Sequence, residues 1–200
     1  MTERVELDDW RTKAILSAIE RAYETFDGPG PHCDYHDRHR TASLNVLTVR
    51  DPTEAQEIVR GFRDSVVGRR VVEIGSGVGF LALELARYAV SVIAIEVDPV
   101  WSWAFTKYLY AVKPPNLTWV FGAAESVANW VRVDLAVIRT RSGVREMVSV
   151  AERMAPEIVL SACEQPLVCS AGDSRLRDIT AFIERRTEEI IDATLLRGRP

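Results

Sequence analysis

Three glycines and two glutamates form the pattern in this sequence whose types and spacing could do chemistry. The glycines stand in the segment Glu73–Gly79, which reads E-I-G-S-G-V-G, and Glu96 follows Gly75 by 21 positions. Glycine permits a positive φ and lets the backbone approach a ligand closely, and a carboxylate accepts hydrogen bonds from hydroxyl and amino groups. A dinucleotide fingerprint, G-x-G-x-x-G, would need a glycine where this chain has Phe80. The spacing therefore predicts a ligand site that disfavours dinucleotides.

The elements that must position these residues form an alternating series. From Arg70 onward, short apolar segments alternate with helical patterns, as in a parallel sheet covered by helices on both faces. The predicted strands are Arg70–Ile74, Ser91–Glu96, Leu117–Phe121, Asp134–Ile138 and Glu157–Ala162. The predicted helices are Phe80–Tyr88, Val100–Val112, Ser126–Val131, Val144–Met154 and Ser174–Ile190. We therefore expect an α/β fold with a doubly wound, mostly parallel sheet, in which the glycine turn and Glu96 lie at the carboxyl ends of the strands.

Both ends of the chain carry helical patterns. An apolar stripe at helical period predicts a helix over about Leu7–Phe26, and the glycines and prolines of Gly28–Pro31 end it. A second helix begins at Asp51, with a proline at its first position, and is expected to reach about Asp64. We assign residues 1–66 to an N-terminal helical extension, a candidate lid, and residues 67–200 to the ligand-binding domain. Near the C-terminus, residues 189–196 fit either one further strand or a continuation of the last helix.

The glycine run and the acidic end of the second strand resemble the class I S-adenosylmethionine-dependent methyltransferases. E-x-G-x-G-x-G resembles motif I of that family, and the resemblance covers roughly Arg70–Ala162. It implies S-adenosyl-L-methionine as the cofactor, with Glu73 orienting the amino-acid moiety and Glu96 accepting both ribose hydroxyls. The segment Val120–Glu125 resembles the one that flanks the adenine, although many members have Asp where this chain has Ala123. The cofactor-binding residues that the resemblance implies are Glu73, Gly75, Ser76, Gly77, Gly79, Glu96, Val97, Ala124 and Glu125.

Two tryptophans follow the acidic strand end. Trp101 and Trp103 could line the adenine pocket, but their predicted helix also carries Phe105, Leu109 and Val112. Because these residues give the helix an apolar face, we favour packing in the core for both tryptophans.

The acceptor half of a methyl transfer is poorly marked. The segment Asp134–Gly143, which in this family meets the substrate, lacks the [D/N]-P-P-[Y/F] signature of enzymes that methylate base amino groups. Val92–Pro99 resembles the ribosomal RNA adenine dimethylases, but their N-L-P-Y motif is absent, and arginines replace the two loop glutamates of protein arginine methyltransferases. Base N-methylation and arginine methylation are therefore disfavoured. Arg139 and Arg141, with Arg145, either recognise a carboxylate or phosphate on the substrate or form a solvated loop.

Few side chains are candidates for catalysis. All the histidines, His32, His36 and His39, lie in one polar stretch. This stretch could be a solvated connection, a metal site, or a lid in which His36 acts as general base beside Tyr35; we expect no metal. Cys163 stands in S-A-C-E-Q-P, which loosely resembles the nucleophile segment of the 5-methyluridine RNA methyltransferases. An inert buried cysteine is the commoner case.

Composition limits the partners. Hydrophobic residues make up 47% of the chain and charged residues 27%, and no apolar stretch is long enough to span a membrane. Three scattered cysteines and the lack of a signal-peptide pattern predict an intracellular, cytoplasmic protein. The net charge of −4 gives no broad attraction to nucleic acid, which would need a local basic patch. Only the group Arg139, Arg141 and Arg145 and the tail arginines Arg197 and Arg199 indicate one.

The sequence favours an enzyme that transfers methyl from S-adenosylmethionine to an oxygen, nitrogen or sulfur atom. Catalysis would come mainly from holding donor and acceptor in line, which needs no dedicated nucleophile. A small molecule or a protein side chain is the favoured acceptor, and RNA is the rival. The alternative from another class is a regulatory module that binds the cofactor without catalysis, which the residue Ala123 and the arginine-rich loop motivate.

Overall fold

The computed structural model describes residues 13–15, 17, 49, 51–139, 144–161 and 166–197, with the backbone alone over 186–197. Residues 13–15 and 17 are helical, as the predicted first helix requires, and the rest of that helix lies outside the described residues. Seven residues singled out above also lie outside the described residues: His32, Tyr35, His36, His39, Arg141, Cys163 and Arg199. In the described part of the chain, no helix is both long and apolar enough to cross a membrane.

A six-stranded sheet with the order β3-β2-β1-β4-β5-β6 forms the centre of the fold. The strands are β1 (Arg70–Ile74), β2 (Ser91–Glu96), β3 (Leu117–Phe121), β4 (Leu135–Ile138), β5 (Glu157–Leu160) and β6 (Leu167–Ser170). The first five are parallel, and β6 pairs antiparallel with β5. The chain builds outward from β1 in one direction through β2 and β3 and in the other through β4 and β5. This order confirms the doubly wound sheet, and it makes the carboxyl ends of β1 and β4 the switch point where ligands bind in such folds.

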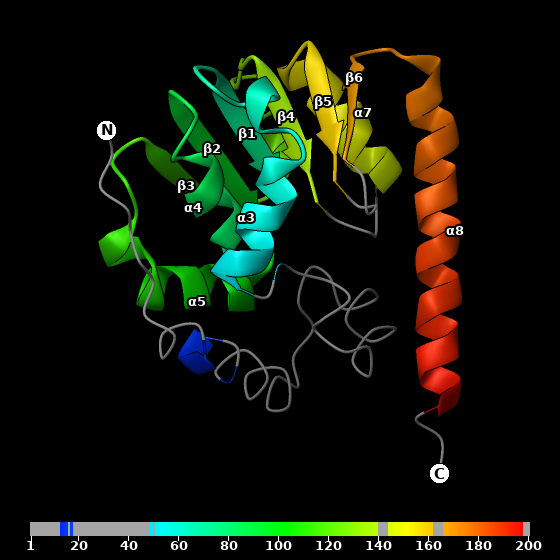
Figure 1. The fold of residues 1–200 in the computed structure, drawn as a ribbon, viewed down its shortest axis with the longest axis horizontal. Helices are drawn as coiled ribbons and strands as arrows, with labels where there is room; N and C mark the ends of the chain where they lie inside the picture. The colour runs from blue at the N-terminus through cyan, green and yellow to red at the C-terminus, as the bar shows by residue number, and fades with distance from the viewer. Residues whose placement is uncertain are drawn as a thin grey trace.

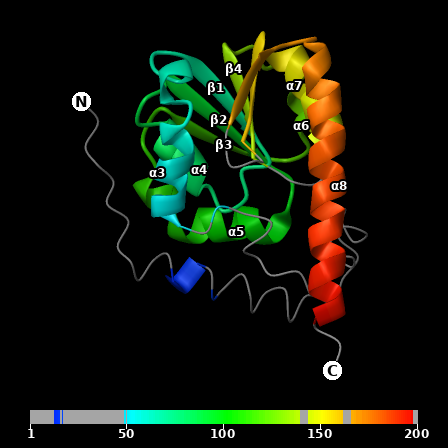
Figure 2. The same ribbon diagram turned by 45° about the vertical axis from the view of Figure 1, so that its right-hand side comes forward.

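Helices cover both faces of the sheet (Figures 1 and 2). One layer contains α3 (Pro52–Arg60), α4 (Phe80–Leu85) and α5 (Pro99–Tyr108), and the other contains α6 (Ala124–Val127), α7 (Val144–Met154) and α8 (Ser174–Arg197). Each layer packs on its own hydrophobic core. Alternation along the strands divides the side chains between them, so that Val71 faces the first core and Val72 the second. Strands buried on both faces explain the continuous apolar segments of the sequence.

Capping residues set where two helices of the first layer begin. The Asp51 carboxylate accepts hydrogen bonds from the backbone N–H groups of Thr53 and Glu54, at 2.8 and 2.9 Å, and a proline occupies the first turn of α3. Asp98 caps α5 in the same way, again followed by a proline. Such caps satisfy amide groups that have no partner within the helix. Because α3 packs on α4 in the first core, it belongs to the layer that covers the sheet, and the division at residue 66 stays a prediction.

Several predicted boundaries were wrong. The expected helix Val100–Val112 ends as α5 at Tyr108 and continues as a 3-10 turn over Tyr110–Val112, since two prolines follow Lys113 and force it into an extended conformation. The other corrections are that α3 ends at Arg60 and not near Asp64, α4 ends at Leu85, α6 covers Ala124–Val127, β4 begins at Leu135 and β5 ends at Leu160. Strand β6 was missed, because four residues directly after a proline give too short a pattern. The C-terminal alternative resolves in favour of the helix, since α8 continues to Arg197.

Candidate functional site

The glycine turn is held against the end of β2 at the carboxyl edge of the sheet. The backbone N–H groups of Gly75 and Ser76 both donate to the carbonyl of Ile95, at 3.0 and 3.1 Å. Gly75 and Gly77 have φ values of 75° and 56°, a region that side chains other than hydrogen disfavour. The Ser76 hydroxyl donates toward the carbonyl oxygens of Glu73 and Ile95, each 3.3 Å away. The turn is therefore tied to the carboxyl ends of both β1 and β2.

Gly79, the third glycine, packs against the protein interior. Its φ is 90°, and a Cβ added there would lie 2.6 Å from Cδ2 of Phe105 and 3.1 Å from Cζ3 of Trp119. These two rings stack almost in parallel, 3.7 Å between centroids and 6° between planes. The fold therefore favours glycine at this position for two reasons. The backbone is left-handed, and the rings of Phe105 and Trp119, here called the aromatic wall, leave no room for a side chain. Its predicted contact with the cofactor stays a prediction.

Glu96 closes the site from the end of β2. Its side chain is buried, and both carboxylate oxygens accept backbone N–H groups: Gly77 donates to Oε2 at 2.6 Å, and Val97 and Asp98 donate to Oε1 at 2.8 and 2.7 Å. A carboxylate offers about four acceptor positions, so three bonds leave about one. Burial raises the pKa of Glu96 to about 7, against the opposing effect of the three N–H groups. Bidentate binding of a ribose therefore requires at least one of these backbone bonds to open.

Glu73, the second buried carboxylate, lies near the carboxyl end of β1 and has one oxygen without a hydrogen-bond partner. The residue is 1% exposed, and its Oε2 has no hydrogen-bond partner. Desolvation, followed by the charge of Glu96, raises the pKa of Glu73 well above its usual range. A buried polar atom without a partner is costly unless a ligand satisfies it. A cationic amino group fits this position, as the resemblance implies for the amino-acid moiety of S-adenosylmethionine.

The end of β3 completes the edge beside Glu96. Gly122 donates its N–H to the Glu96 carbonyl at 2.8 Å, which brings the following residues to the carboxyl end of β2. Ala124 is buried at the start of α6, and Glu125 is exposed. The structure therefore gathers the glycine turn, both glutamates and the predicted adenine-side segment at one edge. Which atoms of the cofactor each one contacts stays a prediction.

The Arg139 side chain is engaged by the N-terminal part of the chain. It follows β4 directly, and its guanidinium lies 3.8 Å from the carboxylate of Glu54 on α3, with both side chains mostly buried. The sequence did not predict this contact, because 85 positions separate the two residues. The pair ties α3 to the carboxyl edge of the sheet. A role for Arg139 in binding substrate remains a prediction.

The two tryptophans of α5 have different environments. Trp101 is 8% exposed and belongs to the first core, which confirms the packing prediction for that residue. The same prediction is wrong for Trp103, which is 44% exposed and carries the ammonium group of Lys107 over its ring, 4.8 Å from the centroid. The helix turns only one stripe toward the sheet, and residues two positions apart lie on different faces.

A sequence relative adds to this geometry. No family model matches the chain. A Pyrobaculum aerophilum protein whose name is given as probable ribosomal RNA small subunit methyltransferase A is 37% identical over 89 residues. This similarity supports the resemblance to the class I S-adenosylmethionine-dependent methyltransferases. The match covers 44% of this chain and 36% of the relative, so the matched part spans about a third of the relative's length.

Two solved structures align with this chain at low identity. A candidate RNA methyltransferase from Pyrococcus horikoshii has 18% identity and a TM-score of 0.48, over 72% of this chain and 71% of that one. Precorrin-6y C5,15-methyltransferase from Geobacter metallireducens has 18% identity and a TM-score of 0.49, over 59% of this chain and 65% of that one. The strand order and the site described above carry the fold assignment without these alignments.

Proposed function

We propose that this methyltransferase domain transfers the methyl group of S-adenosylmethionine to RNA. The observation that carries the proposal is the 37% identity over 89 residues with a protein named as a ribosomal RNA methyltransferase. RNA was the rival acceptor in the sequence, behind a small molecule or a protein side chain. The relative reverses that order, since the sequence holds no positive signature for either of the other two acceptors.

The residues of the carboxyl edge suit the donor half of the reaction. The cofactor supplies a methyl group activated on a sulfonium. Glu73, with its unsatisfied Oε2, would receive the amino group, and Glu96 would accept the ribose hydroxyls after a backbone bond opens. The tethered glycine turn would hold the cofactor in one orientation. These residues act by positioning, which supplies much of the rate enhancement when no covalent intermediate forms.

The segment after β4 restricts the acceptor atom. It reads R-T-R-S-G over 139–143 and carries no [D/N]-P-P-[Y/F] motif. The proposal therefore concerns acceptor atoms of RNA other than the exocyclic amino groups of the bases. Digestion of a labelled product to nucleosides identifies the modified atom directly.

The test is to incubate the full chain with S-adenosylmethionine labelled in its methyl group and separate RNA, protein and small-molecule fractions of a cell extract. We expect label in RNA, and no label with the variant Glu96→Ala. Label confined to protein or small molecules would contradict the RNA proposal and restore the acceptors that the sequence favoured. Tight cofactor binding without transfer to any fraction would instead favour the regulatory module.

A further inference from the structure

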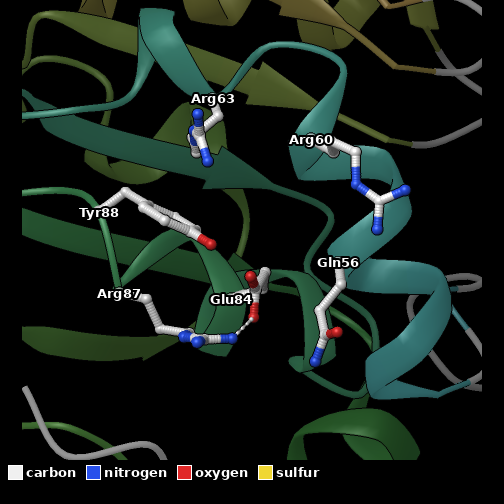
Figure 3. A pocket seen from close by; sticks show the side chains of 6 residues that line it. All are labelled: Gln56, Arg60, Arg63, Glu84, Arg87 and Tyr88. Atoms are coloured by element: carbon white, nitrogen blue, oxygen red, sulfur yellow. Dashed lines mark hydrogen bonds and ion pairs between the residues drawn. The ribbon is translucent and has the colours of Figure 1, made fainter.

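We call the carboxyl edge that holds the glycine turn, Glu73 and Glu96 the cofactor edge. An arginine-rich pocket lies between α3 and α4, outside that edge (Figure 3). Its volume is about 170 Å³, below the roughly 300–1,000 Å³ typical of sites for whole small-molecule ligands. The six residues that line this arginine pocket are Gln56, Arg60, Arg63, Glu84, Arg87 and Tyr88. Figure 3 shows Arg63, Glu84, Arg87 and Tyr88 around one hollow, with Gln56 and Arg60, whose guanidinium turns outward, on the α3 side of it. A pocket of this size suits a small charged group better than a cofactor.

The arginine pocket carries an excess of positive charge. Arg87 pairs with the buried carboxylate of Glu84, at 2.9 Å, and these two charges offset each other. Within the described residues, no carboxylate pairs with Arg60, and Arg63 is 3.8 Å from the fully exposed carboxylate of Asp64, a contact that contributes little. Two guanidinium groups therefore remain available in the pocket. Their planar forks match the oxygens of a phosphate.

Neighbouring groups give the arginine pocket a defined shape. The guanidinium groups of Arg63 and Arg87 lie 6.0 and 5.8 Å from the centroid of the Tyr88 ring, within the range of cation–π attraction. The half-buried amide of Gln56 adds two N–H donors on the α3 side, and the Tyr88 hydroxyl can add another. Tyr88 thus restricts where the guanidinium groups of Arg63 and Arg87 can lie, which reduces the entropy lost when Arg63 binds a ligand.

The arginine pocket and the glycine turn lie toward opposite ends of α4. The helix begins immediately after Gly79, and Arg87 comes eight positions later, which at 1.5 Å per helical residue is roughly 12 Å along the axis. The pocket residues come from two segments about 25 positions apart and form no motif. This is the local basic patch that a chain of net charge −4 needs in order to bind nucleic acid.

We propose that the arginine pocket binds one backbone phosphate of an RNA whose acceptor nucleotide lies at the cofactor edge. This inference rests on the proposed function, because it takes RNA as the substrate. Arg60 and Arg63 hold the phosphate oxygens, and Gln56 donates a further hydrogen bond. The contact fixes the position of the strand and reads no sequence, as is usual for contacts to phosphate.

The test measures binding of a fluorescent 12-nucleotide single-stranded RNA to the full chain by anisotropy, over a series of salt concentrations. We expect the double variant Arg60→Ala/Arg63→Ala to bind about tenfold more weakly. Its slope of log K against log salt should be smaller by about 0.7, the value for one phosphate of a single strand. The variant Arg60→Lys/Arg63→Lys should recover part of the affinity, because it keeps the charge but loses the fork.

The matched control is Arg153→Ala, which removes one exposed arginine from α7 on the opposite face of the sheet. An equal loss of affinity in the control and in Arg60→Ala alone would overturn the proposal, because charge anywhere would then suffice. Competition with pyrophosphate distinguishes the source of the phosphate. A pocket variant that loses pyrophosphate binding but keeps RNA binding would show that the site takes a free phosphate, which also overturns the proposal.

Methyl transfer separates this inference from the proposed function. RNA that binds through the pocket but receives no methyl group would contradict the proposed function alone. RNA that is methylated while both pocket arginines are dispensable for binding would contradict the arginine pocket alone. The dissociation constant for S-adenosylmethionine should be the same in the double variant and in the native chain, since the pocket lies outside the cofactor edge.

Discussion

The cofactor edge and the arginine pocket differ in charge, in burial and in the way the chain assembles them. The edge contains two carboxylates, Glu73 and Glu96, both nearly inaccessible to water and close enough for the charge of one to raise the pKa of the other. The pocket contains two available guanidinium groups, those of Arg60 and Arg63, which are largely exposed. The edge is therefore acidic and shielded from solvent, whereas the pocket is basic and exposed to solvent.

The two sites therefore depend on different physical interactions with their ligands. Burial makes the carboxylates expensive to ionise, so they depend on fixed N–H donors and on a cationic ligand. The arginines keep their hydration, so they attract a phosphate mainly through charge, in a salt-dependent way. A change at the edge should therefore alter folding and cofactor binding together, whereas a change in the pocket should alter only the affinity for RNA.

The largest effect is expected from Gly79→Ala, which tests whether the edge is rigid. The methyl group would meet Phe105 at 2.6 Å in a left-handed backbone conformation. We expect the free energy of unfolding to fall by about 3 kcal/mol, combining strain in φ with overpacking, as measured by urea denaturation. Gly68→Ala is the matched control, because Gly68 also has a positive φ, 72°, but its added Cβ would meet nothing within 4 Å. Equal losses in both variants would show that the aromatic wall has no role.

The next effect is the loss of cofactor affinity in Glu96→Ala. This change removes the proposed ribose acceptor and leaves three backbone N–H groups without their carboxylate. We expect S-adenosylmethionine to bind about 100-fold more weakly, equivalent to about 2.7 kcal/mol, in isothermal titration calorimetry. Binding of RNA to the arginine pocket should change little. An unchanged dissociation constant for the cofactor would remove the main support for this site.

Stability against pH gives a third and smaller difference between the two regions. Burial raises the pKa of Glu96 from 4.5 to about 7 and raises that of Glu73 well above its usual range. The folded chain therefore binds more protons than the unfolded chain. The stability that comes from this difference in pKa is fully present below about pH 4.5 and is lost as the pH rises through about 7. From Glu96 alone, we expect the free energy of unfolding to fall by about 2 kcal/mol between pH 5.5 and 8.

The measurement for this third prediction is urea denaturation without cofactor at several pH values. Glu96→Gln supplies the control, because a neutral amide cannot titrate and should give a shallower dependence on pH. A native chain that is more stable at pH 8 than at pH 5.5 would contradict the raised pKa values of the two buried glutamates.

The smallest effect is expected for the stability of the pocket variants. Arg60 and Arg63 are exposed, and in the described residues Arg63 makes only the weak contact with Asp64 and the cation–π contact with Tyr88. We expect Arg60→Ala/Arg63→Ala to change the free energy of unfolding by less than about 0.5 kcal/mol. Thermal denaturation checks this value. A loss comparable to that of Gly79→Ala would mean that the pocket has a structural role, and the contrast between the two regions would disappear.

The sequence predicted well which residues meet at the carboxyl edge, because these residues are local, and their binding of the cofactor stays a prediction. Glu73 and the glycines lie in one turn, and the continuous apolar strand before Glu96 placed that carboxylate at the end of β2. Parallel strands with connecting helices bring these strand ends to one edge. The doubly wound, mostly parallel sheet with helices on both faces followed from the same alternation, and the structure confirms it.

The arginine pocket and the contact between Glu54 and Arg139 could not be predicted in this way. Arg60 and Arg87 come together only because α3 packs on α4, and no periodic pattern specifies which two helices of a layer are neighbours. The sequence pointed to Arg139 as a substrate contact, but its nearby carboxylate is 85 positions away. The missed strand β6 has a related cause, because four residues gain their strand conformation from pairing with β5.

The aromatic wall behind Gly79 affects which glycines of the turn would be replaced first in descendants that lost the function. Gly75 and Gly77 face the ligand edge, and a lineage that abandoned methyl transfer would release them from the demand of the cofactor. Gly79 is also packed against Phe105 and Trp119, so the fold would continue to select against any side chain there. In inactive descendants, the third glycine should therefore outlast the first two. A surviving glycine at that position is evidence of ancestry before it is evidence of activity.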